Sequence, residues 1–427
     1  MARRLVFITG RFLLAARRIT VETFVTHLEA AIDGTKLPCD VVQTVHADRP
    51  LWVKYDLPGI RRAVNPDVIA KRAPTLWRYR ELLPLPAESQ PITLGEGMSP
   101  LLPAPTLGAS LGLRDLWIKD ESQLPTGSFK SRGLCMAISM AAHFGIKRIA
   151  IPTAGNAGGA MAAYAARAGI EAFVFMPRDT PIINQIECVL AGAKVYLVNG
   201  LITDCGAVVR GGVDATGWFD CSTLKEPYRI EGKKTMGLEL AEQFDWKLPD
   251  VILYPTGGGT GLIGMWKAFH ELRKLGWLKS DTMPRMVAVQ SDGCAPIPRA
   301  FDAGDRFAEP WKEAKTCASG LRVPQAIGDF MILDAVRESG GCAVSVAESR
   351  IVETMRQAVS AEGISICPEA ATCVLAIERL LAKKRITPDD RIVLFNTGAG
   401  TKYVETVTLD LPVIDRPLSV DYHSIVR

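Results

Sequence analysis

The sequence predicts an α/β protein whose sheet is covered by helices on both faces. Apolar runs typical of buried strands recur between amphipathic helical runs from about residue 115 to residue 400; three of them are 171–176, 193–198 and 286–290. Strands that alternate with helices favour a largely parallel sheet. The 427 residues suggest two or more folding units, and no apolar stretch of the sequence has the length that a membrane span needs.

The net charge of the chain is concentrated at its start. Residues 1–24 carry five arginines against one glutamate, and this excess equals the net charge of +4 of the whole chain. The remaining residues are neutral overall, which argues against a basic surface for nucleic acid. An Arg-rich, acid-poor leader is typical of an organelle presequence. The alternative that we prefer is a short extension or an upstream start codon, with the protein in the cytoplasm.

The ten cysteines indicate a reducing compartment and no metal centre. They are scattered, with no C-x-x-C pair and no zinc spacing. Unpatterned cysteines in a long chain favour the cytoplasm over an oxidising compartment. The five histidines lack metal spacing as well. We therefore expect no metal site.

The most informative stretch runs from Pro125 to Gly133. It places Lys130 directly after a Gly-Ser-Phe turn, at the head of an apolar run typical of a helix. At a helix N-terminus the macrodipole disfavours an ammonium ion and favours the free amine. A lysine in that state forms Schiff bases with carbonyl cofactors. On this pattern alone, an ordinary surface lysine at a helix start remains the alternative.

Two further turns, each after a strand-like run, suit the binding of oxygen-rich groups. After residues 148–152 the chain turns sharply and begins a small-residue helix at Asn156, whose amide can donate to an oxygen. A plain capping asparagine is the alternative there. After residues 251–255, the glycine-rich segment 257–261 makes a nest of backbone N–H groups for a phosphate.

The same glycine-rich segment begins a match to G-x-G-x-x-G, from Gly259 to Gly264. A dinucleotide-binding turn would need an acidic residue at the end of the next strand, about twenty positions on. Asp281 instead stands before the next strand-like run, which starts at Met286. The pattern therefore favours a phosphate cradle over an NAD site. A fourth turn follows residues 391–395, and the hydroxyl of Thr397 in it could meet a ring nitrogen.

At these four turns the chain resembles threonine synthase, a pyridoxal-phosphate (PLP) enzyme of fold type II. The resemblance runs from about residue 36 to residue 412, with further landmarks at 76–84, 95–97, 228–235 and 362–364. It implies two α/β domains with open, twisted, mostly parallel sheets and the cofactor between them. The expected segments are a leader (1–24), an arm (25–95), a large domain (96–135 and 241–412), a small domain (136–240) and a tail (413–427).

Carried over to this sequence, the family pattern gives each turn a role. Lys130 would hold PLP as a Schiff base, and Asn156 would donate to the phenolic oxygen of the cofactor. The cofactor phosphate would lie on Gly257, Gly258, Gly259, Thr260 and Gly261. Thr397 would face the pyridine nitrogen and leave the ring neutral, which is typical of eliminations and replacements at the β and γ carbons.

The substrate positions depart in part from the family pattern. Ser131, Ala154 and Ala157 stand where many threonine synthases have Asp or Thr. The residues expected to bind substrate are Ser128, Thr153, Ala154, Ala157 and Arg229. The guanidinium of Arg229 matches the geometry of a substrate phosphate. Lys225 is a second cationic candidate for that phosphate.

The resemblance implies the conversion of O-phospho-L-homoserine and water to L-threonine and phosphate, with Lys130 as general base and acid. One alternative is a threonine or serine dehydratase (ammonia-lyase), which needs no site for a substrate phosphate. A replacement on phosphoserine and a non-catalytic protein of the same fold are two others. We expect a homodimer that binds a small amino-acid substrate, and neither nucleic acid nor a membrane.

Overall fold

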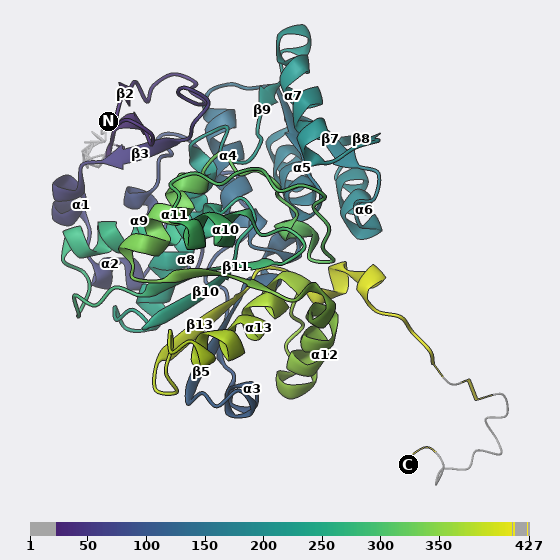
Figure 1. Ribbon diagram of the computed structural model, residues 1–427. Helices are drawn as coiled ribbons and strands as arrows, with labels where there is room; N and C mark the ends of the chain where they lie inside the picture. Colours follow the sequence, from purple (N-terminus) through teal and green to yellow (C-terminus); the bar gives the residue numbers. More distant parts are fainter. Residues whose placement is uncertain (1–22, 412, 415–424, 426–427) are drawn as a thin grey trace, which may run out of the picture.

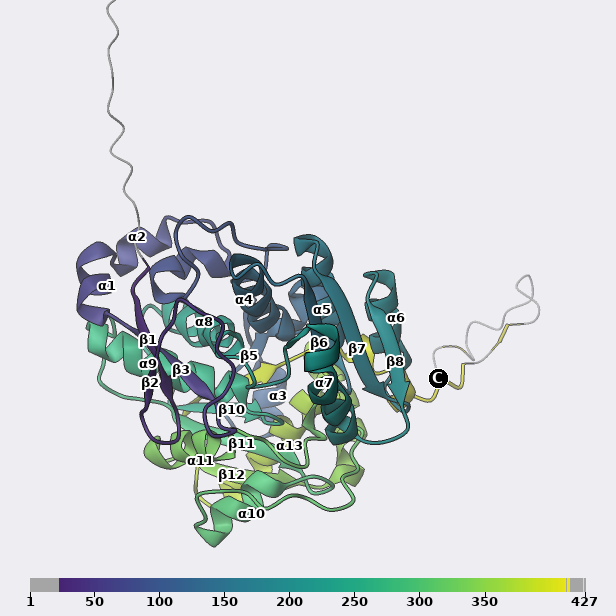
Figure 2. The same cartoon turned by 90° about the horizontal axis from the view of Figure 1, so that it is seen from above.

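The computed structural model describes residues 23–411, 413–414 and 425 (Figure 1). Its two larger sheets belong to two α/β units that lie side by side, with a small N-terminal sheet packed against them (Figure 2). The predicted strand runs form β7, β8 and β11, which confirms the α/β fold with open, mostly parallel sheets. No helix in the described ranges combines the length and apolar character that crossing a membrane requires.

The large sheet has the strand order β12-β11-β10-β13-β5-β4. Its strands are β4 (Leu101–Pro103), β5 (Asp115–Asp120), β10 (Val251–Pro255), β11 (Arg285–Ser291), β12 (Cys342–Val346) and β13 (Arg391–Asn396). All pairs are parallel except that of β4 with β5, at the edge of the sheet. A parallel interior with one antiparallel edge strand is common in sheets of this kind.

Helices cover both faces of the large sheet because its central strands are apolar on both sides. Val251 and Leu253 of β10 pack against α3 (Pro105–Ser110), α12 (Ile351–Glu362) and α13 (Pro368–Ala382). Ile252 and Tyr254 of the same strand point the other way, because side chains alternate along a strand. They meet α8 (Tyr228–Gln243), α9 (Thr260–Leu275), α10 (Pro296–Ala303) and α11 (Asp329–Glu338).

The small sheet is parallel throughout, with the order β8-β7-β6-β9. Its strands are β6 (Arg148–Pro152), β7 (Glu171–Pro177), β8 (Lys194–Val198) and β9 (Phe219–Asp220). The helices α4 (Lys130–His143), α5 (Asn156–Ala168) and α6 (Ile182–Leu190) pack on one face. Helix α7 (Ile202–Thr216) packs on the other, through Cys205 and Val209.

The N-terminal segment forms a sheet of its own, which the sequence patterns did not predict. It pairs β1 (Val25–Ala30) antiparallel with β2 (Lys36–Leu37) and β3 (Leu51–Tyr55). The helices α1 (Leu57–Ala63) and α2 (Pro66–Ala70) follow, each with Pro in its first turn and a side-chain cap, from Asp56 and Asn65. The sheet and helices form the left side of Figure 1.

The division of the chain into arm, large domain and small domain at the predicted bounds stays a prediction. The strands β6 to β9 lie within 136–240, but α8, most of which falls in the same range, packs against the large sheet. The leader at residues 1–24 lies outside the described residues except for its last two, and most of the tail at 413–427 lies outside them as well. All ten cysteines are in the described part of the chain and are free thiols there.

Candidate active site

A cavity of about 390 Å³ lies between the two larger sheets. Three of its lining residues stand at the carboxyl ends of parallel strands: Pro152 ends β6, Pro255 ends β10, and Thr397 follows β13. Ligands of open α/β sheets bind outside the carboxyl ends of the strands. Helix α7, which packs on the small sheet, and the loop 319–327 complete the walls.

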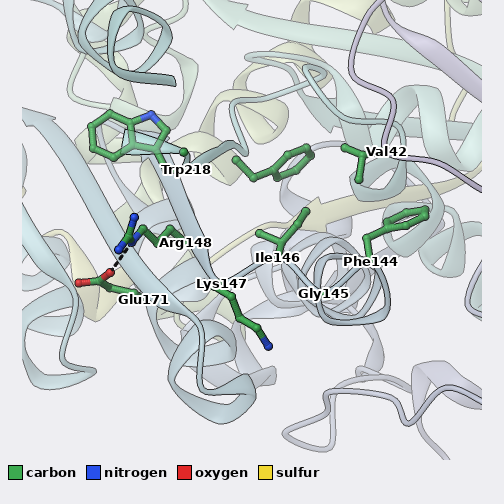
Figure 3. A pocket seen from close by; sticks show the side chains of 10 residues that line it. Val42, Phe144, Gly145, Ile146, Lys147, Arg148, Glu171 and Trp218 are labelled. Carbon is green, nitrogen blue, oxygen red and sulfur yellow. Dashed lines mark hydrogen bonds and ion pairs between the residues drawn. The ribbon is translucent and has the colours of Figure 1, made fainter. Parts of the chain in front are cut away.

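Another hollow, of about 600 Å³, lies at the opposite ends of the small-sheet strands (Figure 3). Its lining includes Arg148 and Glu171, the first residues of β6 and β7, which form an ion pair of 3.1 Å. Lys147 also lines it, and its side chain extends away from that pair. None of the predicted site residues lines this hollow, so the cavity between the sheets is the candidate active site.

Lys130 lies in the wall of the cavity as the first residue of α4. Its amine is 4.3 Å from the centre of the Phe129 ring. Burial lowers the pKa of Lys130 to about 7, with a further contribution from the positive charge of Arg229, while Glu369 opposes the shift. An amine with this pKa is uncharged in a large fraction of molecules near neutral pH, and the uncharged form is the one that acts as a nucleophile and a general base.

The lowered pKa predicts how the stability of the cofactor-free protein depends on pH. Between pH 7 and the ordinary lysine pKa of 10.5, the unfolded chain holds a proton on Lys130 that the folded chain has lost. Stability therefore rises with pH across this window. Lys130→Met should raise Tm at pH 6, and the gain should shrink toward pH 10. Thermal unfolding of the two cofactor-free proteins over this pH range measures the difference between their Tm values. A difference that does not change with pH would contradict the prediction.

The glycine-rich segment forms a tight cradle at the start of α9. A methyl group on Gly257 would lie 2.4 Å from the carbonyl oxygen of Gly320, and one on Gly261 would lie 1.9 Å from the Tyr254 hydroxyl. Gly259 has φ +74°, a conformation that favours glycine. Across the described residues, the N–H groups of 257–261 have no acceptor in the protein. The cradle therefore suits a phosphate group.

Asn156 begins a chain of hydrogen bonds that crosses the cavity. Its Nδ2 donates to the Tyr403 hydroxyl at 3.2 Å, and that hydroxyl donates to Glu369 Oε1 at 2.8 Å. The Gly320 N–H donates to the same carboxylate oxygen at 2.8 Å. Among the described residues, Asn156 Oδ1 and Glu369 Oε2 are buried without a partner, so both stay available to a bound molecule. Sequence reasoning missed Tyr403 and Glu369.

Thr397 lines the cavity, and its backbone is bonded to the turn that carries Lys130. Its hydroxyl is 3.6 Å from the Cys367 sulfur, and its carbonyl oxygen accepts from the Phe129 N–H at 3.0 Å. That backbone bond ties the turn of Lys130 to the turn after β13. Ser128 is buried in the same turn and pairs with Gly398, but it does not line the cavity.

The remaining predicted substrate residues fall into two groups. Thr153, Ala154 and Ala157 line the cavity; the Thr153 hydroxyl bonds the backbone of Gly155, donating at 2.9 Å and accepting at 3.1 Å. Arg229 does not line it.

Arg229 is buried on α8 beside Glu226. Its Nη1 donates to the Cys221 carbonyl at 2.9 Å, and its Nε lies 4.0 Å from Glu226. Burial raises the pKa of Glu226 to about 7, against the charge of Arg229. Besides Lys130, the basic side chains that line the cavity among the described residues are Lys225, Arg210 and Arg322. Arg322 is engaged in two bonds to Asp179, at 2.7 and 2.9 Å.

The site residues fit PLP on their own chemistry: a lysine with a lowered pKa, a cradle of free N–H groups, and an amide and a hydroxyl in one cavity. The family model described as "Pyridoxal-phosphate dependent enzyme" matches residues 92–398. The maize serine racemase structure superposes with a TM-score of 0.62 at 23% identity, over 71% of this chain and 88% of that one, which shows the fold.

Comparison with curated relatives identifies a family within the PLP-dependent enzymes. The threonine synthase of Methanosarcina acetivorans is 32% identical over 88% of this chain and 90% of its own length. That of Methanocaldococcus jannaschii is 32% identical over 85% of this chain and 89% of its own length. The chain belongs to the threonine synthase family of the PLP-dependent enzymes. It is a PLP-dependent lyase, as predicted, and the cofactor prediction is confirmed.

Proposed function

We propose that the protein converts O-phospho-L-homoserine and water to L-threonine and phosphate. The observation that carries this proposal is a cavity with two places for an anion. The glycine cradle suits the phosphate of the cofactor, and Lys225 and Arg210 supply cations at other points of the wall. A dehydratase acting on threonine or serine needs only the first of these. The similarity to curated threonine synthases supports the same choice.

The bound cofactor supplies an electron sink for the negative charge that develops at the substrate Cα. Lys130 would hold the cofactor and then take the Cα proton, since its pKa of about 7 allows both forms at neutral pH. Asn156 and Thr397 would orient the ring from two sides of the cavity. A Cβ–H bond and the bond from Cγ to the phosphate oxygen break, a proton is added at Cγ, and water adds its hydroxyl at Cβ while its second proton leaves. Lys130 is the group placed to return the proton.

One pair of assays tests the reaction. The holoenzyme is given O-phosphohomoserine, and the release of phosphate is measured together with the formation of threonine. A parallel assay measures 2-oxobutyrate formed from threonine. Phosphate and threonine in equal amounts support the proposal. Rapid formation of 2-oxobutyrate without phosphate release would assign the protein to the dehydratases instead.

Lys225→Ala is expected to lower kcat/KM for O-phosphohomoserine about 10- to 100-fold. The side chain lines the cavity, and a hydrogen bond to a charged group contributes about 1.5–3 kcal/mol. The affinity for PLP should stay unchanged, because Lys225 lies outside the glycine cradle. Steady-state kinetics at saturating PLP measure the effect, with the exposed Lys247→Ala as the matched control.

Arg229 stays a second proposal for the same phosphate, because its Nε has no hydrogen-bond acceptor among the described residues. Its guanidinium would have to turn toward the cavity to reach the substrate. If Arg229→Ala loses kcat/KM while Lys225→Ala keeps it, Arg229 is the phosphate ligand and Lys225 is not. Unlike Lys225→Ala, the Arg229 variant also leaves Glu226 buried without its cation, so Tm must be compared as well. The homodimer and the cytoplasmic location are proposals too.

A further inference from the structure

Lys233 is a fully buried lysine that has no carboxylate partner among the described residues. Its neighbour on α8, Lys234, pairs with Glu231 at 2.7 Å and with Glu271 at 2.9 Å. Lys233 instead donates from Nζ to the carbonyl oxygen of Phe129. Burying a charged lysine without an acidic partner destabilises the folded protein. The position of Lys233 therefore suggests a role other than stability.

The contacts of Lys233 lead directly to the turn that carries Lys130. Phe129 precedes Lys130 in the sequence, and Lys233 holds it at two points. One is the bond to its carbonyl oxygen; the other is its ring, whose centre is 3.8 Å from Lys233 Nζ. The Lys130 amine lies over the same ring, 4.3 Å from the centre. The amines of Lys233 and Lys130 therefore both contact the Phe129 ring.

Close packing of α4 against α8 brings Lys233 to this place. A methyl group on Gly133 would lie 3.0 Å from Lys233 Cε and 3.1 Å from the carbonyl oxygen of Arg229. One on Gly232 would lie 2.1 Å from the carbonyl oxygen of Arg132. Both glycines let the helix backbones approach. The crossing leaves the Lys233 side chain no route to solvent.

The charges around Lys233 are mostly positive. Lys130 and Arg132 face it from α4 and Arg229 from its own helix, while Glu121 is the one acid among its main influences. Burial and these cations, led by Lys130, lower the pKa of Lys233 well below its usual range. Glu121 is already bound to Arg132, at 2.5 Å from its Nε. A neutral Lys233 amine can still donate to the Phe129 carbonyl.

We propose that Lys233 is a positioning residue for Lys130: it fixes the carbonyl oxygen and the ring of Phe129, and so sets where the reactive amine lies. Lys233 does not line the cavity and touches neither of the two phosphate sites described above. Its influence should therefore appear in the chemical steps and in the protonation of Lys130, and hardly in substrate binding. The inference rests on the proposal that Lys130 holds the cofactor.

The test replaces Lys233 by Met, which keeps the length of the side chain and removes the donor. In the holoenzyme, kcat should fall about tenfold or more, with KM for O-phosphohomoserine changed less than about twofold, because a buried carbonyl is left without its donor. The visible absorbance of the cofactor bound to Lys130 should titrate with pH at a shifted midpoint. Lys233→Gln, which restores an N–H donor, should recover most of kcat.

Lys267→Met is the matched control. The side chain of Lys267 is only 10% exposed, but it pairs with Glu231 and Glu271, away from Phe129. Its loss should lower Tm without moving the absorbance midpoint. A Lys233→Met enzyme with the wild-type kcat and the wild-type absorbance midpoint would overturn the proposal. It would also be overturned if Lys233→Gln, at an unchanged Tm, had a kcat and a midpoint as altered as those of Lys233→Met. If Lys130→Ala keeps the visible absorbance, the cofactor assignment fails instead.

Discussion

Lys130→Ala is expected to abolish turnover and the visible absorbance of the bound cofactor. The variant removes the one lysine in the cavity wall whose pKa is lowered to about 7, and with it the covalent anchor and the general base. General acid–base catalysis alone contributes about 10²- to 10⁴-fold, so kcat should fall by at least about three orders of magnitude. Absorbance spectra and phosphate release measure the two losses.

The control for this result is Lys147→Ala, an exposed lysine at the other hollow (Figure 3). It should keep both the spectrum and the rate. Thermal unfolding of the cofactor-free Lys130→Ala protein should show a cooperative transition, so that the losses are not caused by unfolding. A Lys130→Ala enzyme with full activity would refute the assignment of the cofactor lysine.

Gly259→Ala is expected to weaken PLP binding strongly. The left-handed conformation at φ +74° costs a residue with a Cβ about 1–2 kcal/mol. If the alanine variant must enter this conformation to bind PLP, its affinity for PLP falls about tenfold. The added methyl group would also lie 2.3 Å from Cδ1 and Cγ1 of Ile332. The cradle must therefore shift, and the loss of affinity should exceed about tenfold.

Gly206→Ala provides the matched control for the cradle. Gly206 lines the same cavity from α7, where an added methyl group would meet Pro152 Cγ at 4.0 Å, an ordinary contact. Titration of the cofactor-free proteins with PLP, followed by absorbance, compares the two variants. Equal affinities for Gly259→Ala and Gly206→Ala would show that the conformation of the cradle is unimportant for the cofactor.

Much of the fold could be predicted from local patterns. Continuous apolar runs predicted β7, β8 and β11 within one or two residues of their ends. Of these, β8 is an edge strand that is largely exposed. The helices at Lys130 and Asn156 begin where a turn meets a small-residue or apolar run. The sheet at residues 25–55 was missed because its strands are only two to six residues long.

The site was predictable only where one turn carries its own chemistry. Lys130 and the glycine segment are of that kind. Glu369 and Tyr403 are not, because their roles depend on a bond between α13 and the turn after β13, and on a further bond to Asn156. The orientation of Arg229 likewise depends on Glu226 and Cys221, which tertiary packing decides. Lys233 reads as one more charged helix residue until its contact with Phe129 is seen.

The cavity draws its walls from both of the larger sheets, and this has a consequence for how the molecule unfolds. A molecule bound there bridges two units that each have a core of their own. By mass action, a ligand that binds only the native state at 100 times its Kd adds about 2.7 kcal/mol to the free energy of unfolding. The thermal stability of the enzyme therefore depends on the supply of its vitamin-derived cofactor. A cell short of that vitamin would hold this enzyme in a less stable form that is more open to proteases.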